Sequence, residues 1–238
     1  VATLKRMADV ESSARKVLGA KPSRTLQQIQ DRVIELRHKF DRIYEELLKS
    51  LSSENIFITN EKQLTDEQGE FVRNYFHTVV RPTLVPIMLD SAPNFPMLKD
   101  KNVYLIVSLL RKSEKSISRK HALIELPTDV IPRFLVLPAQ EDKNFVILLD
   151  DVIRYCLNEI FALFRYNIFE AYTIKLTRDA ELDVDEDVSE SLLKKIEESL
   201  KQRKRGRPVR FIYDEAMPSD LLRFLTRRLK LRKSDNLI

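Results

Sequence analysis

The sequence predicts an α+β protein, in which a helical hairpin precedes a domain with a mixed or mainly antiparallel sheet and helices. Two observations support this fold class. Apolar residues recur at helical spacing between residues 26 and 52, whereas short segments after residue 100 carry the apolar runs and alternation of strands. The composition suits a globular core, because 43% of the 238 residues are hydrophobic and only three are glycine.

The clearest element is a helix from Leu26 to about Ser52, in which Thr25 and Gln28 have the spacing of a capping box. Its apolar residues alternate steps of three and four along one seam: Leu26, Ile29, Val33, Leu36, Phe40, Ile43 and Leu47. A first helix is expected upstream, ended by Gly19 and Pro22. The seam could form a coiled-coil dimer, but three heptads are short for one, so we favour packing within the hairpin.

After Asn55 the helical spacing of apolar residues gives way to a short apolar run at 56–58, which predicts a domain boundary between residues 1–55 and 56–238. Thr65 and Gln68 predict the capped start of a helix. Residues 103–111 and 121–126 predict a hairpin whose first strand is apolar on both faces, as in a strand that is covered on both sides. Further strands are expected at 133–137, 145–148, 172–177 and 209–213, and further helices begin at Asp150 or Asp151, Ser189 and Pro218.

The helix that Asp150 or Asp151 would cap carries one apolar stripe. The stripe consists of Ile153, Cys156, Leu157, Ile160, Phe161 and Phe164, so Cys156 is expected in the core. As the only cysteine, it has no partner for an intrachain disulfide, which indicates a reducing cytoplasm.

Signatures of nucleotide loops and metal sites fail in this sequence. The three glycines lie far apart, although a phosphate loop needs them together. The histidines His38, His77 and His121 occur singly, in unlike contexts, which argues against a zinc site. The acidic stretch 179–190 resembles a calcium loop, but Val188 replaces its glycine and Lys194 its last glutamate, so a solvated turn is the preferred interpretation.

Two basic runs, 111–120 and 201–210, account for much of the excess of 41 Lys and Arg over 36 Asp and Glu. Each run could hold a polyanion, although a solvated face is the commoner explanation of such a run. Aromatic residues are scarce in both, which argues against nucleic acid.

The candidates for a phosphate contact are Arg178, Asp179 and Arg210. Arg178 and Asp179 follow the strand in which Tyr172, Ile174 and Leu176 alternate with polar residues, so the arginine could meet phosphate at the end of the strand. An ion pair between Arg178 and Asp179 that holds the turn is the preferred alternative.

Five blocks in order resemble polyphosphate kinase of the bacterial phosphohistidine type. The blocks are NEKQL at 60–64, IPRF at 131–134, ILLD at 147–150 with IRYCL at 153–157, TRDAE at 177–181, and PVRF at 208–211. The resemblance spans essentially the whole chain. It implies the later part of an N-terminal helical domain, followed by a head domain that is similar to a phox-homology fold.

The resemblance implies a parent enzyme that reversibly transfers the terminal phosphate of ATP to inorganic polyphosphate, with magnesium and a phosphorylated histidine. It places the catalytic residues outside this chain, so no catalytic role is carried onto His38, His77 or His121. We therefore expect an inactive fragment that serves assembly of a homodimer or higher homo-oligomer and shapes an anionic channel.

The expected location is the cytoplasm, with the periphery of the inner membrane as a second expected location. No apolar run is long enough for a transmembrane segment. The alternative function is a free-standing basic binding module for nucleic acid or phosphoinositide.

Overall fold

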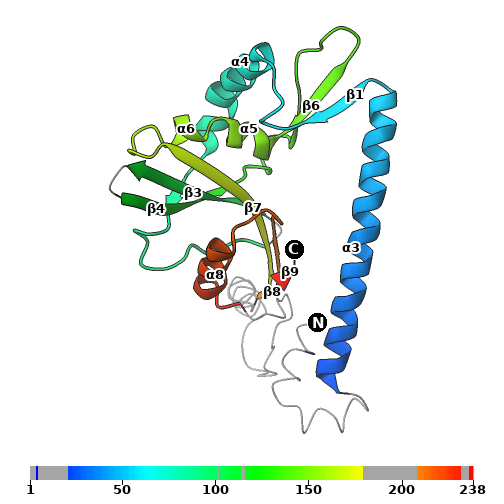
Figure 1. Cartoon of the computed structure of the whole chain (residues 1–238), viewed down its shortest axis with the longest axis vertical. Coiled ribbons are helices and arrows are strands. Elements are labelled where there is room, and N and C mark those ends of the chain that lie inside the picture. Colours follow the sequence, from blue (N-terminus) through cyan, green and yellow to red (C-terminus); the bar gives the residue numbers. More distant parts are fainter. Residues whose placement is uncertain are drawn as a thin grey trace, which may run out of the picture. The chain divides into compact units, whose positions relative to one another are not determined.

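The computed structural model describes residues 4, 21–100, 102–113, 116–178, 208–231 and 236–237 (Figure 1). The chain divides into two compact units. One comprises Val1–Ser50 with Arg178–Val209, and the other comprises Leu51–Thr177 with Arg210–Ile238. A domain boundary at residue 55 stays a prediction.

Helix α3 (Pro22–Ser53) supplies most of the described residues of the first unit. Its last residue confirms the expected end near Ser52. The expected cap at Thr25 is wrong, because Thr25 lies inside the helix. Proline suits the first helical position, since the amide hydrogen that it lacks has no helical acceptor there.

The seam of α3 is exposed along its second half. Leu36, Phe40, Ile43 and Leu47 are each more than half exposed. The segment expected to cover the seam lies outside the described residues, apart from Leu4, which is helical. Packing of the seam within a helical hairpin therefore stays a prediction.

A six-stranded sheet forms the centre of the second unit, with the strand order β2-β4-β3-β7-β8-β9. Its strands are β2 (Ile87–Met88), β3 (Val103–Ser113), β4 (Ser116–Glu125), β7 (Ile168–Arg178), β8 (Pro208–Tyr213) and β9 (Asn236–Leu237). The expected hairpin is confirmed, because β3 pairs antiparallel with β4 from Tyr104↔Glu125 to Ser113↔Ser116. The sheet is mixed, since β8 pairs parallel with β9, and this confirms the α+β class.

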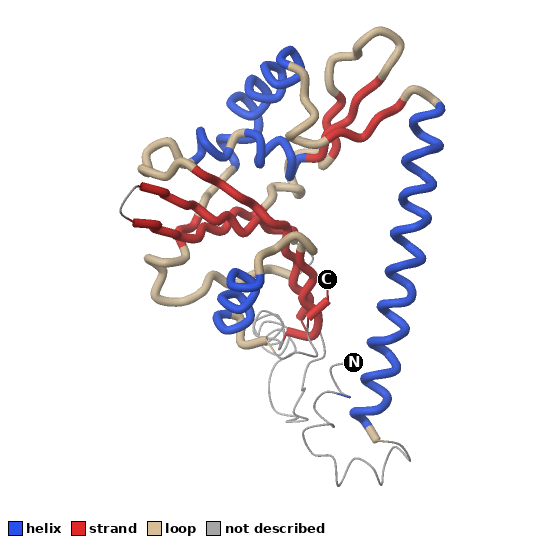
Figure 2. The backbone as a smooth tube through the Cα atoms, in the orientation of Figure 1, coloured by secondary structure: helices blue, strands red, loops and turns tan. Residues whose placement is uncertain are grey.

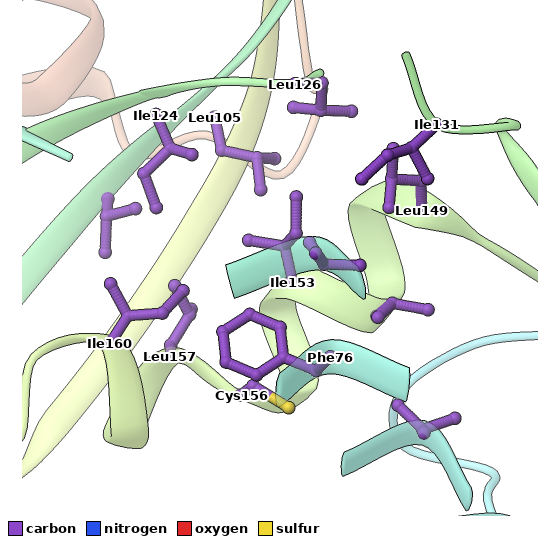
Figure 3. Close-up of a cluster of buried hydrophobic side chains, with 14 of the residues drawn as sticks. Phe76, Leu105, Ile124, Leu126, Ile131, Leu149, Ile153, Cys156, Leu157 and Ile160 are labelled. Carbon is purple, nitrogen blue, oxygen red and sulfur yellow. The ribbon is translucent and has the colours of Figure 1, made fainter. Parts of the chain in front are cut away.

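Strand β3 buries side chains on both of its faces, as its sequence predicted. Leu105, Val107 and Leu109 belong to one buried cluster, whereas Tyr104 and Ile106 belong to a second cluster. Successive side chains of a strand point to opposite faces, so the two clusters lie on the two sides of the sheet. Figure 3 shows the first cluster, in which Phe76, Ile153 and Leu157 from helical segments meet Leu105 and Ile124 from the sheet.

Two groups of helical segments, each nearly continuous in sequence, border the first cluster. They are α4 (Asp66–Tyr75), the π-helical turn η1 (Phe76–Val80), the 3₁₀ turn η2 (Arg81–Thr83), α5 (Leu149–Tyr155) and α6 (Leu157–Ile160). The predicted capping box starts α4: Gln68 N–H donates to Thr65 Oγ1 at 3.4 Å, and Thr65 N–H donates to Gln68 Oε1 at 3.3 Å. The second cluster is completed by α8 (Ser219–Arg228), which begins after Pro218 as expected.

A second, three-stranded sheet has the order β1-β6-β5. Its strands are β1 (Ile56–Thr59), β6 (Asn144–Leu148) and β5 (Phe134–Val136). One face, with Ile147 at its centre, packs into the first cluster. The strands at 133–137 and 145–148 are thereby confirmed to within one residue at each end, whereas the helix expected from Ser189 lies outside the described residues.

The helix after β6 corrects two expectations. Neither Asp150 nor Asp151 caps it, because Leu148 is at the cap position and both carboxylates lie buried in the first turn. The apolar stripe is also interrupted, since α5 ends before Cys156 and α6 ends at Ile160, which leaves Phe164 in a loop. Cys156 is a core residue as expected, and burial raises the pKa of its thiol to about 12.

Arg154 compensates the two buried carboxylates and fastens α5 to the sheet. Its Nη1 lies 2.6 Å from Asp151 Oδ1 and 3.7 Å from Asp150 Oδ2. Its Nη2 donates to Thr173 Oγ1 at 2.6 Å and its Nε to the Ala171 carbonyl at 3.3 Å, both on β7. Burial, together with the charge of Asp150, outweighs Arg154 and raises the pKa of Asp151 to about 6.

We predict that Gly69→Ala destabilises the chain, although alanine normally favours a helix interior by about 1 kcal/mol. An added Cβ at Gly69 in α4 would overlap the Tyr155 hydroxyl and lie 3.1 Å from its ring carbon Cζ. Arg73 restricts movement of the Tyr155 ring. Its Nη1 donates a hydrogen bond to the hydroxyl at 2.9 Å, and its guanidinium group lies over the ring. Urea unfolding should show a loss of about 1–3 kcal/mol. Glu70→Ala, at an exposed position of the same helix, is the control, and a more stable Gly69→Ala variant would contradict the prediction.

We predict that Asp151 makes the chain less stable as the pH rises from about 4 to 6. Its pKa is about 6 in the folded chain against 3.8 as the ordinary value, so the folded state binds more protons in that window. The contribution of this group to the free energy of unfolding should fall by about 1–2 kcal/mol. Urea unfolding at pH 4.5 and 7 measures it, and Asp151→Asn should remove that part of the difference. Asp142→Asn, in an exposed turn, should leave the difference intact. An Asp151→Asn variant with the full wild-type difference would exclude this assignment.

Candidate functional site

The predicted phosphate-contact residues lie on two neighbouring strands of the large sheet. Arg178 is the last residue of β7 and is half-buried, whereas Arg210 is an exposed residue of β8. Asp179 lies outside the described residues. Its expected ion pair with Arg178 therefore stays a prediction.

Alternation along the strands does not bring the two arginines to one face. Arg178 follows Leu176 by two residues and so shares its face of β7, whereas Arg210 lies opposite to its neighbour Phe211 on β8. Leu176 and Phe211 belong to the same buried cluster, beside α8. Alternation thus gives Arg178 the face of β7 that turns to the cluster beside α8, and gives Arg210 the opposite face of β8.

The basic run at 111–120 surrounds the tip of the β3–β4 hairpin. Arg111 and Lys120 are exposed, and the side chains of Lys112 and Lys115 lie outside the described residues. Arg119 forms an ion pair with Asp220 at the start of α8, which neutralises its charge. Of the run at 201–210, only Arg210 can be placed on the structure.

The histidines serve different local structures. His38 is exposed on α3, and His77 Nε2 lies 2.5 Å from Glu159 Oε2. His121 on β4 is only 13% exposed, and its ring stacks on Phe224 of α8 with 4.6 Å between centroids. Burial lowers the pKa of His121, which favours the neutral imidazole near pH 7.

Contacts around His121 hold α8 against the sheet. The backbone N–H of His121 donates to Asp90 Oδ2 at 2.6 Å. On α8, Arg228 Nη2 donates to the carbonyls of Leu89 at 3.3 Å and Ala92 at 3.2 Å, and its guanidinium lies over the Phe224 ring. These contacts give His121 a structural role between β4 and α8.

Within the described ranges, no group of three or more His, Cys, Asp or Glu side chains could hold a metal ion. The acidic stretch 179–190 falls outside those ranges. The described residues thus offer magnesium no cluster of three or more such ligands.

Two exposed apolar surfaces were missed by the sequence patterns. The outer face of the small sheet carries Phe134 and Val136, which are 62% and 64% exposed. The loop between α6 and β7 carries Leu163, which is 97% exposed. Neither surface had a distinct signal, because Phe134 and Val136 belong to a short strand and Leu163 lies within the range of an expected helix but outside its apolar stripe.

No helix in the described part of the chain is both long enough and apolar enough to cross a membrane.

Comparison with known proteins gives one consistent result. A model of the polyphosphate kinase middle domain matches residues 67–238. The polyphosphate kinase of Vibrio vulnificus strain YJ016 is 40% identical over 217 residues, which are 90% of this chain and 30% of that protein. The polyphosphate kinase of Escherichia coli strain K12 is 37% identical over 217 residues, with 90% and 31% covered.

A solved structure shares the fold. The crystal structure of polyphosphate kinase from Porphyromonas gingivalis matches with a TM-score of 0.71 and 24% identity, over 99% of this chain and 33% of that one. The chain spans about a third of the length of these proteins. With a family model that matches most of its residues, this chain belongs to the polyphosphate kinase family and includes that family's middle domain.

Proposed function

We propose that this chain is the assembly and channel-shaping part of a polyphosphate kinase, which reversibly transfers the terminal phosphate of ATP to inorganic polyphosphate. The observation that carries this proposal is the match of residues 67–238 to the middle domain of that family. ATP and magnesium belong to the full-length enzyme in this proposal, and the chain alone is inactive. The transferred group is strongly anionic, so a non-catalytic domain can contribute charge around its path.

The arginines Arg178 and Arg210 are our candidates for that contribution. Each lies on a strand that carries a buried side chain close by, Leu176 on β7 and Phe211 on β8. Because the two lie on different faces of the sheet, we propose that they contact polyphosphate independently. A contact of Asp179 with phosphate would have to be indirect, since a carboxylate accepts hydrogen bonds but repels the anion.

We predict that Arg178→Ala in the full-length enzyme lowers phosphotransfer by about tenfold or more, as expected for the loss of one charge-assisted contact. Thermal stability should change little by comparison. The measurements are polyphosphate synthesis from ATP and thermal unfolding of the same preparations. Arg210→Ala tests the second candidate, and Arg81→Ala is the matched control at an exposed arginine away from both strands. Parallel losses of activity and stability in Arg178→Ala would make this residue part of the scaffold.

A titration distinguishes the proposed function from the alternative, a binding module for nucleic acid or phosphoinositide. The chain is titrated with medium-chain polyphosphate and with duplex DNA of matched charge at two salt concentrations, because counterion release inflates nonspecific affinity at low salt. A preference for polyphosphate that survives high salt supports a place on the path of the polymer. Equal binding that salt abolishes supports assembly as the main role.

We further propose that the chain assembles into a homodimer or higher homo-oligomer. The outer face of the β1-β6-β5 sheet supports this. The register places Phe134 opposite Leu148, and Val136 opposite Val146, which is in turn opposite Ile58 on β1. Paired residues share a face, so this face is apolar across all three strands. Exposed apolar areas of this kind are typical of protein interfaces.

We predict that Phe134→Asp shifts the chain toward the monomer, because a charge would be desolvated at the centre of the proposed interface. Sedimentation velocity over a range of concentrations measures the shift, and about a tenfold weaker association is expected. Val85→Asp, at a largely exposed valine outside the small sheet, is the control. Unchanged association of the Phe134→Asp variant would assign the interface to another surface.

We infer a cytoplasmic location for the full-length enzyme, with peripheral contact to the inner membrane. The single buried cysteine suits a reducing compartment. The exposed apolar loop before β7 suits contact with a membrane surface.

A further inference from the structure

The loop between α6 and β7 is an ordered turn that holds a leucine in solvent. Phe161, which is 1% exposed, anchors the loop in the first buried cluster. Phe164 N–H donates to the Phe161 carbonyl at 2.9 Å, and Tyr166 N–H donates to the Phe164 carbonyl at 2.9 Å. Leu163, within the first of these turns, is 97% exposed, and Phe164, where the two turns meet, is partly exposed. The fold therefore presents this apolar side chain in a defined position.

The same end of the sheet carries cations. The register aligns Ile168, the first residue of β7, with Leu110 on β3, and aligns Leu110 with Arg119 on β4. Asn167 N–H also donates to the Leu110 carbonyl at 3.1 Å, which joins the loop to this end of the hairpin. The exposed cations here are Arg111, Lys120 and Arg165. Figures 1 and 2 show the loop before β7 near the turn end of the β3–β4 hairpin.

Nearby acidic side chains are engaged by groups of the protein. Glu159 pairs with His77, and Asp220 pairs with Arg119. Glu170 accepts a hydrogen bond from the Tyr172 hydroxyl at 3.3 Å. Glu170 keeps its negative charge, since the tyrosine hydroxyl is neutral, so the surface for a partner combines an exposed apolar turn with three cations and this one carboxylate.

This combination fits the surface of an anionic lipid bilayer. Apolar side chains can enter the boundary between headgroups and acyl chains, while lysine and arginine beside them attract anionic lipids. A protein partner would be favoured by a flat or hollowed apolar area, whereas the apolar part of this surface is one short turn with Leu163 exposed on it.

We propose that the loop at 161–167, together with Arg111, Lys120 and Ile168, is the surface through which this chain contacts anionic membranes. The proposal rests on the peripheral contact with the inner membrane inferred above, and it identifies the residues that make this contact. Leu163 and Phe164 insert, and the three cations hold the headgroups. This contact is separate from Arg178 and Arg210, so it can fail without affecting the proposed role in phosphotransfer.

The test is co-sedimentation of the chain with vesicles of phosphatidylglycerol and phosphatidylethanolamine, compared with vesicles of phosphatidylcholine alone. We expect binding to the anionic vesicles, reduced about tenfold or more by Leu163→Asp. Arg165→Gln combined with Lys120→Gln should weaken binding by about 25-fold, since each surface cation contributes roughly fivefold. Thermal unfolding of each variant checks the fold, which should not change because Leu163 is exposed.

The control is Val85→Asp, which adds the same charge at a largely exposed valine and should bind the vesicles as the wild type does. Binding that Leu163→Asp leaves intact would overturn the assignment of this surface while keeping the peripheral location. Equal binding to both kinds of vesicle, or to neither, would overturn the membrane contact itself. In solution without membranes or detergent, the full-length Leu163→Asp enzyme should synthesise polyphosphate as the wild type does. A loss of this activity would overturn the membrane assignment of Leu163 and would indicate that the residue contributes to assembly of the enzyme.

Discussion

Burial of strand β3 on both of its faces is the constraint on which the second unit depends. Its odd-numbered residues Leu105, Val107 and Leu109 face the helical segments α4, η1, α5 and α6, and Tyr104 and Ile106 face α8. Each fully buried aliphatic side chain of this kind contributes about 1.5–3 kcal/mol relative to an exposed one. The strand therefore requires a cover on each side, and the rest of this unit supplies the two covers.

Polar contacts decide how each cover is oriented. On one side, Arg154 joins α5 to β7 while compensating Asp150 and Asp151, and its removal would leave Asp151 without its ion pair and Asp150 with Arg133 alone. On the other side, the Arg119–Asp220 ion pair and the stack of His121 on Phe224 fix α8 across β4. Apolar burial favours any close packing, whereas these contacts select one arrangement because each has a defined geometry.

The same sheet separates the surfaces that we connect with function. Arg178 and Arg210 lie on opposite faces, the apolar face with Phe134 belongs to the small sheet, and Leu163 lies at the hairpin end of the large sheet. A domain without catalytic residues can in this way serve assembly, membrane contact and the path of an anionic polymer through separate surfaces. His77 and His121 are engaged in local contacts, with Glu159 and with Phe224.

The sequence by itself determined the class of the fold, the β3–β4 hairpin, the capping box at Thr65 and the family. These depend on the local spacing of residues and on the order of short sequence blocks along the chain. Tertiary structure alone decided the rest. Asp150 and Asp151 have the sequence of a helix cap, but Arg154 lies within reach only once α5 packs on β7, and burial then turns them into an ion-pair cluster. Phe164 continues the apolar stripe of the expected helix, yet the helix ends at Ile160 and the turn that follows exposes Leu163. Periodicity reports which side chains could share a face, whereas exposure depends on what the rest of the chain places against that face.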